Sequence, residues 1–456
     1  MKLLYTVCAL ALFFGSNSYG FEKKITKVAW SDSLEVVFLE DHRFPTYALS
    51  IYFADGALGD HRGRLGETDA MFANLTAGTN RYNQKQISDA LEFYGTSFSY
   101  NVTHEYSSVG IAGLAKDFRP NVKMLCHLFK DATFPKRELL TYKRKLVSAF
   151  ESMASNHSAL ANRIFRELSL KNTLYQAPVS GKIKTIKRFT SKFLDKKLQY
   201  FKKKVKKRIY LVGPNKLDEL KRVVSEECDF NIAGASFVRS VKDSNAKFAK
   251  SRKIYLIPVP NANQAQVRVG SYLGQSEIEE PDLMSVASGF LGGGYTSKLM
   301  TEIRHKRGLS YSVSTVATKQ KQYGRAAIST FTKNPSIAQL MKVIKDSLNE
   351  MSSGKFSRLE LRDSVNFLSG SYLFQFEKGS SYLANLLYFD HIGRNYDELY
   401  AFPEKIKRFK KPQVAEMIEK LFSWDKQTVV IVGSRNLLKD LRAFGSVQVV
   451  DYKKFL

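Results

Sequence analysis

The sequence is poor in cysteine, in acidic residues and in long apolar stretches. With 3 Cys in 456 residues, the fold cannot be a scaffold held together by disulfides. Beyond residue 20, no window contains the roughly 18 consecutive apolar residues of a transmembrane helix. Only 43 Asp and Glu stand against 71 Lys and Arg, which leaves a formal net charge of +28. This excess indicates either a nucleic-acid or other anionic partner, or simply a basic solvated surface.

The rest of the composition is that of a folded protein. Aromatic residues make up 12% of the chain and charged residues 25%, whereas disordered chains are poor in aromatic and branched apolar side chains. A single hydrophobic core stops growing at about 250 to 300 residues. A chain of 456 residues therefore predicts two or more domains.

Residues 1–20 have the pattern of a signal peptide. Lys2 supplies a positive start, residues 3–14 are almost all apolar, and Ser18 and Gly20 are small residues at the −3 and −1 positions of a cleavage site. We therefore expect the mature protein to be exported, soluble and periplasmic.

Two cysteines, Cys126 and Cys228, remain after the signal peptide with Cys8 is removed. In an oxidising compartment they could form a disulfide. They could equally be two separately buried small apolar side chains, because the sequence gives no distance between them.

The chain repeats its landmarks. A strand ending in glycine occurs at Gly213 and again at Gly433, 220 residues apart. A similar short sequence begins a long helical pattern near Glu138 and again near Glu360, 222 residues apart. Landmarks in the same order at nearly one offset predict two homologous halves.

We accordingly expect a signal peptide at 1–20, an N-terminal half at 21–235, a linker at 236–250 and a C-terminal half at 251–456. Strand and helix patterns intermix in each half without strict βαβ alternation. This order predicts an α+β fold, in which helices pack on one face of a mainly antiparallel sheet. The two halves are expected to form a clamshell.

A specific resemblance comes from two nearby segments. Residues 289–299 read GFLGGGYTSKL, and residues 303–313 read IRHKRGLSYSV. Both resemble the C-terminal-half signature of the pitrilysin/insulinase zinc metallopeptidase family, which includes the mitochondrial processing peptidases. The duplicated halves, and Gly78 followed by Thr79 after an amphipathic helix, fall where this family would place them.

The residues that bind zinc in active members do not carry over. Those members resemble one another in a helix reading H-x-x-E-H, in which two histidines bind zinc and the glutamate activates a water molecule. Counted back from Gly78, the histidine positions hold Asp69 and Ala73 and the glutamate position holds Phe72. Alanine offers no ligand, and phenylalanine cannot accept a proton. The family's further glutamate ligand is expected at 149–151, where a lone Glu151 does not restore a site.

No other histidine arrangement replaces the lost motif. The seven histidines are His42, His61, His104, His127, His157, His305 and His391. None pairs with another at the i,i+3 or i,i+4 spacing of a helical zinc site. The neighbouring His104 and Glu105 lie in a predicted strand, where we expect an ordinary surface pair.

An arginine and a tyrosine of the family do carry over. The resemblance implies that this pair, seven residues apart, binds the peptide backbone and stabilises the oxyanion of the tetrahedral intermediate. Arg304 and Tyr311 have this spacing and are the predicted substrate-binding residues, since both are donors suited to developing negative charge. The alternative is a surface arginine on a helix and a tyrosine packed at a sheet edge.

The resemblance also implies a partner. Some family members are heterodimers in which one subunit binds zinc and the other lacks it but keeps the Arg–Tyr pair. We therefore expect an exported non-catalytic subunit that binds no cofactor, with zinc in a homologous partner and an extended peptide held along a sheet edge. A homodimer, a purely structural subunit and a stand-alone clamshell that binds peptides or polyanions without cleaving them remain alternatives.

Two further patterns are interpreted as structural features in preference to binding sites. Residues 182–208 contain 13 Lys or Arg, with apolar residues at helical spacing between them. They predict a packed helix with a solvated lysine face, and an anionic-surface site is the alternative. Nucleic acid is not expected as a partner. The three glycines at 292–294 predict a tight turn between helices. A phosphate-binding Walker loop is not indicated, because the Gly-Lys-Ser/Thr ending of that motif does not follow them.

Overall fold

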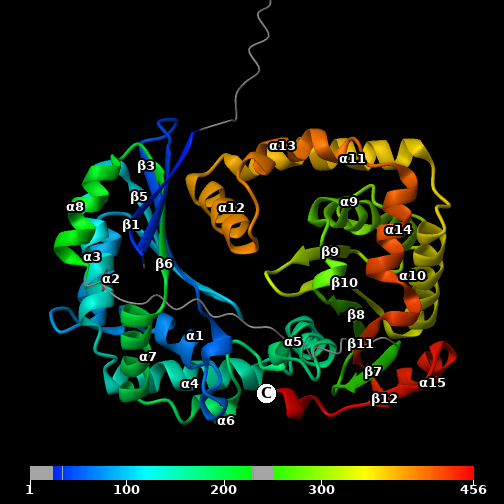
Figure 1. The fold of residues 1–456 in the computed structure, drawn as a ribbon. Coiled ribbons are helices and arrows are strands. Elements are labelled where there is room, and N and C mark those ends of the chain that lie inside the picture. Colours follow the sequence, from blue (N-terminus) through cyan, green and yellow to red (C-terminus); the bar gives the residue numbers. More distant parts are fainter. Residues whose placement is uncertain (1–23, 33, 229, 231–250) are drawn as a thin grey trace, which may run out of the picture.

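In the computed structural model, the described residues are 24–32, 34–228, 230 and 251–456. The predicted signal peptide at 1–20 and linker at 236–250 lie outside them. Within the described ranges, no helix is long and apolar enough to cross a membrane. Figure 1 shows two lobes, each built around a β-sheet.

The first sheet has six strands in the order β1-β2-β6-β3-β5-β4. Its strands are β1 (Ile25–Ser31), β2 (Leu34–Glu40), β3 (Thr46–Phe53), β4 (Ser97–Val102), β5 (Ser107–Leu114) and β6 (Lys207–Gly213). All neighbouring strands are antiparallel except β2 and β6, which run parallel. Strand β4 is therefore an edge strand.

The second sheet has the order β12-β7-β11-β8-β10-β9, which repeats the first in every place but the β1 edge, taken here by β12. Its strands are β7 (Lys253–Pro258), β8 (Gln264–Leu273), β9 (Val313–Lys319), β10 (Gly324–Lys333), β11 (Thr428–Gly433) and β12 (Val447–Val449). Strand β7 runs parallel to both β11 and β12, and the other pairs are antiparallel. The edge strand β9 corresponds in position to β4. The predicted α+β class with mainly antiparallel sheets is confirmed.

Helices surround both sheets. In its N-terminal half the chain forms α1 (Glu67–Ala73), α2 (Gln84–Phe93), α3 (Phe118–Asp131), α4 (Lys136–Ser152), α5 (His157–Ser169), α6 (Ile183–Ile186), α7 (Ser191–Lys204) and α8 (Leu217–Glu227). It continues with α9 (Pro281–Gly292), α10 (Ile337–Ser352), α11 (Arg358–Tyr372), α12 (Gly379–Ile392), α13 (Asp397–Ile406), α14 (Lys411–Phe422) and α15 (Leu438–Leu441).

Each sheet is apolar on both faces, because its central strands bury consecutive residues. In β6, Ile209 and Leu211 join the core under α1, α3, α7 and α8, whereas Tyr210 and Val212 join a core on the opposite face. Side chains alternate between the faces of a strand. An unbroken apolar run thus requires a helix layer on each side.

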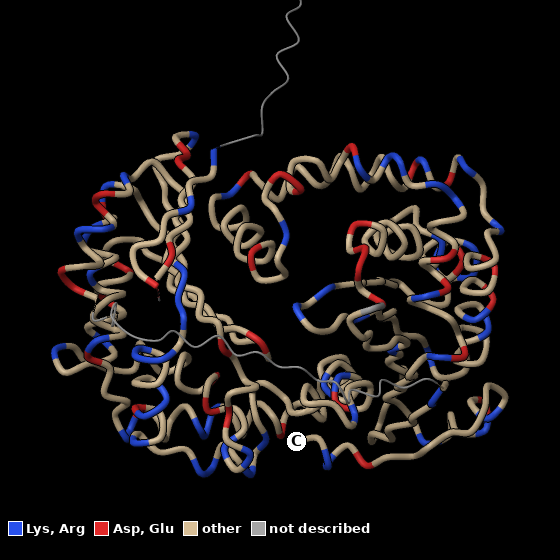
Figure 2. Tube along the Cα trace, in the orientation of Figure 1, with Lys and Arg blue, Asp and Glu red and all other residues tan. Residues whose placement is uncertain are grey.

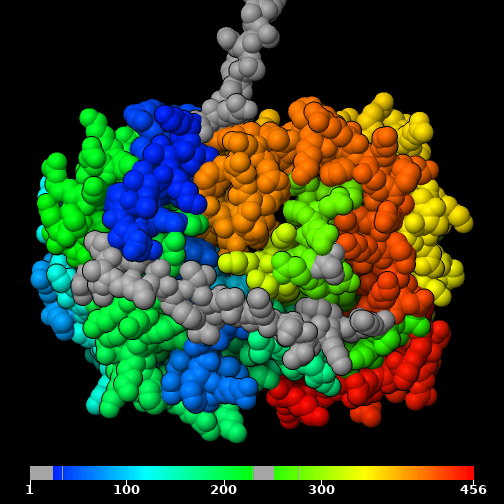
Figure 3. All heavy atoms as spheres, in the orientation of Figure 1, coloured from blue at the N-terminus to red at the C-terminus, as the bar shows by residue number. Residues whose placement is uncertain are grey.

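The second face of each sheet is covered by a helix from the other half of the chain. Helix α12 packs on β3 and β6 of the first sheet, and α5 packs on β8 and β11 of the second. The two helices begin 222 residues apart, so they occupy equivalent places in the duplicated halves. Figure 3 shows the atoms of α12 directly beside those of the first strands. The halves thus exchange one helix each, which the sequence did not predict.

Buried polar contacts fix α12 on the first sheet. The carboxylate of Asp390 accepts a hydrogen bond from the hydroxyl of Tyr210 at 2.8 Å and pairs with Arg208 at 2.9 Å and with Lys27 at 3.3 Å. These three partners come from the first sheet. The negative charge on α12 therefore meets a basic sheet face.

Cys126 on α3 and Cys228 at the end of α8 form a disulfide, with 4.6 Å between their Cα atoms. The bond closes a loop of 102 residues and ties two helices that lie on the same face of the first sheet. The open question about these cysteines is thus answered in favour of pairing.

The β4–β5 and β9–β10 turns meet tip to tip, and Glu105 joins them. Its carboxylate accepts hydrogen bonds from the backbone N–H groups of Lys321 at 2.9 Å and Gln322 at 3.0 Å. It also accepts one from the Tyr175 hydroxyl at 3.1 Å and lies 3.0 Å from Nε2 of His391. This carboxylate therefore holds together segments from both halves.

The expectation of an ordinary surface pair at His104 and Glu105 was wrong. Both residues lie in the turn between β4 and β5, and His104 is 5% exposed. The Nε2 atom of His104 lies 2.8 Å from the carbonyl oxygen of Ala177. Burial lowers the pKa of His104 to about 4, so this histidine is neutral at pH 7.

Candidate functional site

The degenerate motif lies on α1, next to the edge strand β4. Asp69 and Ala73 are one helical turn apart and share a partly exposed face. Phe72 points elsewhere and is 0% exposed. The helix thus still presents the two former ligand positions, but no ligand pair occupies them.

Phe72 belongs to an aromatic core. Its ring centroid lies 5.5 Å from that of Phe53, 6.4 Å from that of Phe129 and 5.3 Å from that of Phe201. A carboxylate at this position would be buried among apolar rings, which is costly without a partner. The place of the family's general base has therefore become part of the hydrophobic core.

Two tyrosines surround Asp69. Tyr100 comes from β4 and Tyr142 from α4, and the carboxylate of Asp69 adds to the rise that burial causes in the pKa of each. Burial, with a smaller contribution from Asp60, raises the pKa of Asp69 to about 6. The sequence identified neither tyrosine.

Helix α4 does not bring residues 149–151 to the motif as expected. Ala149 and Glu151 are exposed near the end of this helix. Tyr142, about two turns earlier, is the residue whose hydroxyl is in electrostatic range of Asp69. Glu151 follows Tyr142 by nine residues on the same helix, so it lies roughly 13 Å further along the helix axis.

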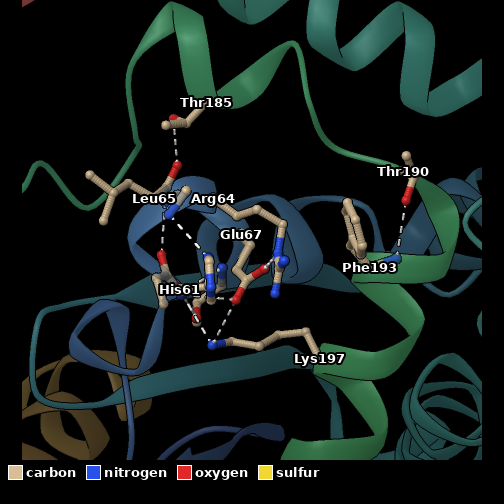
Figure 4. A network of polar contacts seen from close by, with 12 residues as sticks. His61, Arg64, Leu65, Glu67, Thr185, Thr190, Phe193 and Lys197 are labelled. Atoms are coloured by element: carbon tan, nitrogen blue, oxygen red, sulfur yellow. Dashed lines mark hydrogen bonds and ion pairs between the residues drawn. The ribbon is translucent and has the colours of Figure 1, made fainter.

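A buried ion network supports the start of α1 (Figure 4). Lys197 of α7 lies 3.2 Å from Asp60 and 3.6 Å from Glu67. Glu67 also accepts hydrogen bonds from Arg64 Nε at 2.6 Å and from the backbone N–H of His61 at 3.2 Å. These carboxylates are committed to structural contacts.

Lys197 belongs to the basic run at 182–208, which is only partly solvated. Lys197, Lys202 and Lys207 are each less than 9% exposed. Burial lowers the pKa of Lys207 to about 8, and its ammonium donates to the carbonyls of Lys202 and Val205 at 2.7 and 2.9 Å. The predicted packed helix is present as α7, but its Lys197 and Lys202 face inward. An anionic-surface role for the run remains a prediction.

Asp69→Asn is expected to stabilise the protein at neutral pH. The folded state holds a proton on Asp69 up to about pH 6, whereas an unfolded aspartate loses it near pH 4. Stability therefore falls as the pH rises through this window, by up to about 3 kcal/mol. Urea unfolding of the variant should show that gain at pH 7 and none at pH 4. Asp195→Asn, at an exposed site on α7, is the matched control. A gain that does not change between pH 4 and 7 would contradict the assignment.

Within the described ranges, no group of three or more His, Cys, Asp or Glu side chains is placed to hold a metal ion. Asp69 is flanked by the phenols of Tyr100 and Tyr142, and these groups do not complete a zinc site of nitrogen, sulfur and carboxylate ligands.

Arg304 and Tyr311 are in contact. Arg304 lies on a π-helical segment, Met300–His305, a geometry that often occurs at functional sites. Gly308, at φ +58°, ends this segment in a left-handed conformation that favours glycine, and the chain then turns into β9. The guanidinium carbon of Arg304 lies 4.3 Å from the ring centroid of Tyr311. Tyr311 is 72% exposed, so it is not the packed strand residue of the alternative interpretation.

A second tyrosine completes this cluster. The guanidinium carbon of Arg304 lies 5.2 Å from the ring centroid of Tyr295, which is 62% exposed. Arg304 is therefore flanked by two aromatic rings, a cation–π arrangement that orients the guanidinium. Tyr295 lies within the signature segment 289–299, but no spacing or motif there singles it out.

The glycine turn brings this cluster close to β9. A Cβ atom on Gly292 would lie 2.6 Å from Cγ2 of Thr315 on β9, so glycine permits the close packing of α9 against this strand. Gly293 and Gly294 follow in the predicted turn. Arg304, Tyr295 and Tyr311 thus lie beside the start of the edge strand β9.

Comparison with known proteins agrees with this arrangement. Residues 199–368 match the family model described as the peptidase M16 inactive domain. This range includes both Arg304 and Tyr311. Residues 199–368 are thus identified as a peptidase M16 inactive domain. The resemblance drawn from the signature segments is thereby confirmed.

M16 relatives align over most of the chain. A protein of Helicobacter pylori named "Non-peptidase homolog YmxG" is 22% identical over 444 residues, which cover 95% of this chain and 99% of that protein. A protein of Rickettsia felis named "Uncharacterized zinc protease" is 23% identical, over 80% of this chain and 86% of its own. A relative named as a non-peptidase and one named as a protease thus both align with most of this chain.

Solved structures show the same fold. The peptidase M16 inactive domain from Pseudomonas fluorescens superposes with a TM-score of 0.80 at 20% identity, covering 90% of this chain and 98% of its own. A protease from Helicobacter pylori gives a TM-score of 0.79 at 12% identity, covering 90% of this chain and all of its own. The M16 architecture therefore extends over both lobes.

Proposed function

We propose that this chain is an exported, non-catalytic M16 subunit of a heterodimeric zinc metallopeptidase. It pairs with a zinc-bearing homologue, holds an extended peptide, and contributes Arg304 and Tyr311 to the partner's zinc site. One observation carries the proposal. An exposed Arg–Tyr pair is kept beside a free sheet edge, in a chain whose own zinc positions hold Asp69, Phe72 and Ala73.

The sheet edges support peptide binding. Strand β4 ends the first sheet and β9 ends the second, and each has a single neighbouring strand among the described residues. Free backbone N–H and C=O groups on an edge strand can pair with an extended peptide whatever its side chains. Such a mode suits a complex that acts on unfolded segments.

Export is supported by the disulfide. A bond between Cys126 and Cys228 fits an oxidising compartment such as the periplasm. Residues 1–20 provide the matching signal pattern. The two observations are independent, because one comes from helix packing and the other from the terminal sequence.

The test is a reconstitution. A homologous chain with an intact H-x-x-E-H motif, from the same source, is assayed on a quenched peptide alone and with this protein. We expect turnover only with both chains, and its loss on zinc chelation. Equal turnover with and without this protein would contradict the proposal. Peptide binding by this protein alone, with no effect on any zinc-bearing homologue, would instead favour the stand-alone clamshell.

A further inference from the structure

A basic pocket lies where the two halves meet, at the ends of both edge strands. Its volume is about 330 Å³. Asn101 and Val102 come from β4, Thr318 from β9, Arg166 from α5 and Arg325 from β10. Both homologous hairpins and an exchanged helix thus build one cavity. Figure 2 shows basic residues along α5 and on the β9–β10 hairpin.

Two arginines give this pocket its charge. No Asp or Glu of the described part of the chain lines it. Among the described residues, the guanidinium groups of Arg166 and Arg325 make no hydrogen bond or ion pair, whereas those of the partly buried Arg208, Arg268 and Arg394 are all engaged. The two guanidinium groups therefore remain available to a ligand.

The groups around the pocket do not neutralise it. Glu105 is the nearby carboxylate, but it is occupied by the two backbone N–H groups, Tyr175 and His391. His104 is neutral, because burial lowers its pKa to about 4. Burial raises the pKa of Tyr323, and both Arg166 and Arg325 act against this rise. Their positive charges thus converge on one lining residue.

We propose that this pocket binds a carboxylate of the peptide held between the edge strands. The proposal rests on peptide binding as the function of the chain. Guanidinium groups recognise carboxylates through paired, charge-assisted hydrogen bonds. Asn101 and Gln320 offer additional amide donors in the lining. The carboxylate comes either from an Asp or Glu side chain or from the peptide's C-terminus, and both sources share this chemistry.

The first experiment selects the ligand from a mixture. The full-length mature protein is incubated with a randomised peptide pool, half with free C-termini and half amidated, and captured peptides are sequenced by mass spectrometry. We expect enrichment of Asp and Glu if side chains are recognised, or of free C-termini if the terminus is. Captured peptides enriched in neither would overturn the pocket proposal and leave peptide binding intact. Failure to capture any peptide, with and without a zinc-bearing partner, would overturn both.

The second experiment tests the two arginines. Dissociation constants are measured for a captured peptide and for its matched neutral form, either Glu→Gln or amidated. Arg166→Ala and Arg325→Ala should each weaken binding of the charged form by about ten- to a hundredfold and leave the neutral form unchanged. Arg325→Lys should retain part of the preference. Arg435→Ala, at an exposed site just after β11 that does not line the pocket, should change neither constant. Equal losses for the charged and the neutral peptide would overturn the proposal.

Discussion

Arg304→Ala and Tyr311→Phe are each expected to lower cleavage by the zinc-bearing partner by about 100- to 1000-fold. Donors fixed opposite a developing oxyanion have this effect when removed singly. Tyr311→Phe keeps the ring that stacks on Arg304 at 4.3 Å and deletes only the hydroxyl. A loss in this variant therefore reports on donation and not on packing. The measurement is kcat/KM of the two-chain complex on a quenched peptide.

A nearby arginine supplies the control. Arg307 follows Arg304 by three residues and is paired with Glu302 at 2.6 Å. Arg307→Ala removes the same charge from the same segment, so it should leave kcat/KM within about threefold, as a surface charge does. Thermal unfolding should be nearly unchanged in all three variants, because Arg304 and Tyr311 interact chiefly at the surface, worth about 0.5–1 kcal/mol. Similar kinetics for Arg304→Ala and Arg307→Ala would contradict the assigned role.

The duplication was predictable because its landmarks are local. Helix α11 begins at a capping box, in which Ser357 Oγ accepts from the Glu360 N–H at 3.0 Å and Glu360 accepts from the Ser357 N–H at 2.6 Å. A capping box depends on only four consecutive residues, so it can be recognised without knowledge of the tertiary fold. The strand ends at Gly213 and Gly433 are equally local.

The exchange of α5 and α12 was not predictable in the same way. An amphipathic pattern shows that a helix covers an apolar surface, but not which sheet supplies that surface. Helix α12 does carry a signal, because buried residues such as Tyr382, Leu387 and Phe389 lie around most of its circumference. A helix that is apolar on several sides has more than one packing partner.

The residues of the candidate site divide in the same way, into those placed by local spacing and those placed by tertiary packing. The spacing of Arg304 and Tyr311, and of Asp69 and Ala73, is set within single helical or turn segments and could be read directly. Tyr142 could not, because its approach to Asp69 depends on the packing of α4. The environment of Glu105 was predicted wrongly, because the alternating pattern of residues 96–111 runs through the turn between β4 and β5 without a break. Only the tertiary contacts reveal that this turn is buried.

Glu105→Ala is expected to lower the free energy of unfolding by about 3–5 kcal/mol, the cost of breaking a buried charged cluster. The carboxylate is 7% exposed. Its removal leaves two backbone N–H groups and His391 without their acceptor at the junction of the halves. Glu105→Gln keeps one acceptor oxygen, so it should cost less, about 1–3 kcal/mol. Glu404→Ala, at an exposed carboxylate whose one ion pair within the described ranges is with Lys407, should cost less than about 1 kcal/mol.

The two tryptophans can show where this energy acts. Trp30 lies on β1 of the first lobe, and Trp424 is buried beside the second sheet. With Trp30→Phe or Trp424→Phe as background, urea unfolding reports on one lobe at a time. The two midpoints should coincide while Glu105 joins the hairpins and separate in Glu105→Ala, because the coupling that remains, through α5, α12 and the other contacts between the lobes, is then weaker. Coincident midpoints together with a cost no larger than that of Glu404→Ala would mean that water replaces the carboxylate and that the remaining contacts suffice to couple the halves.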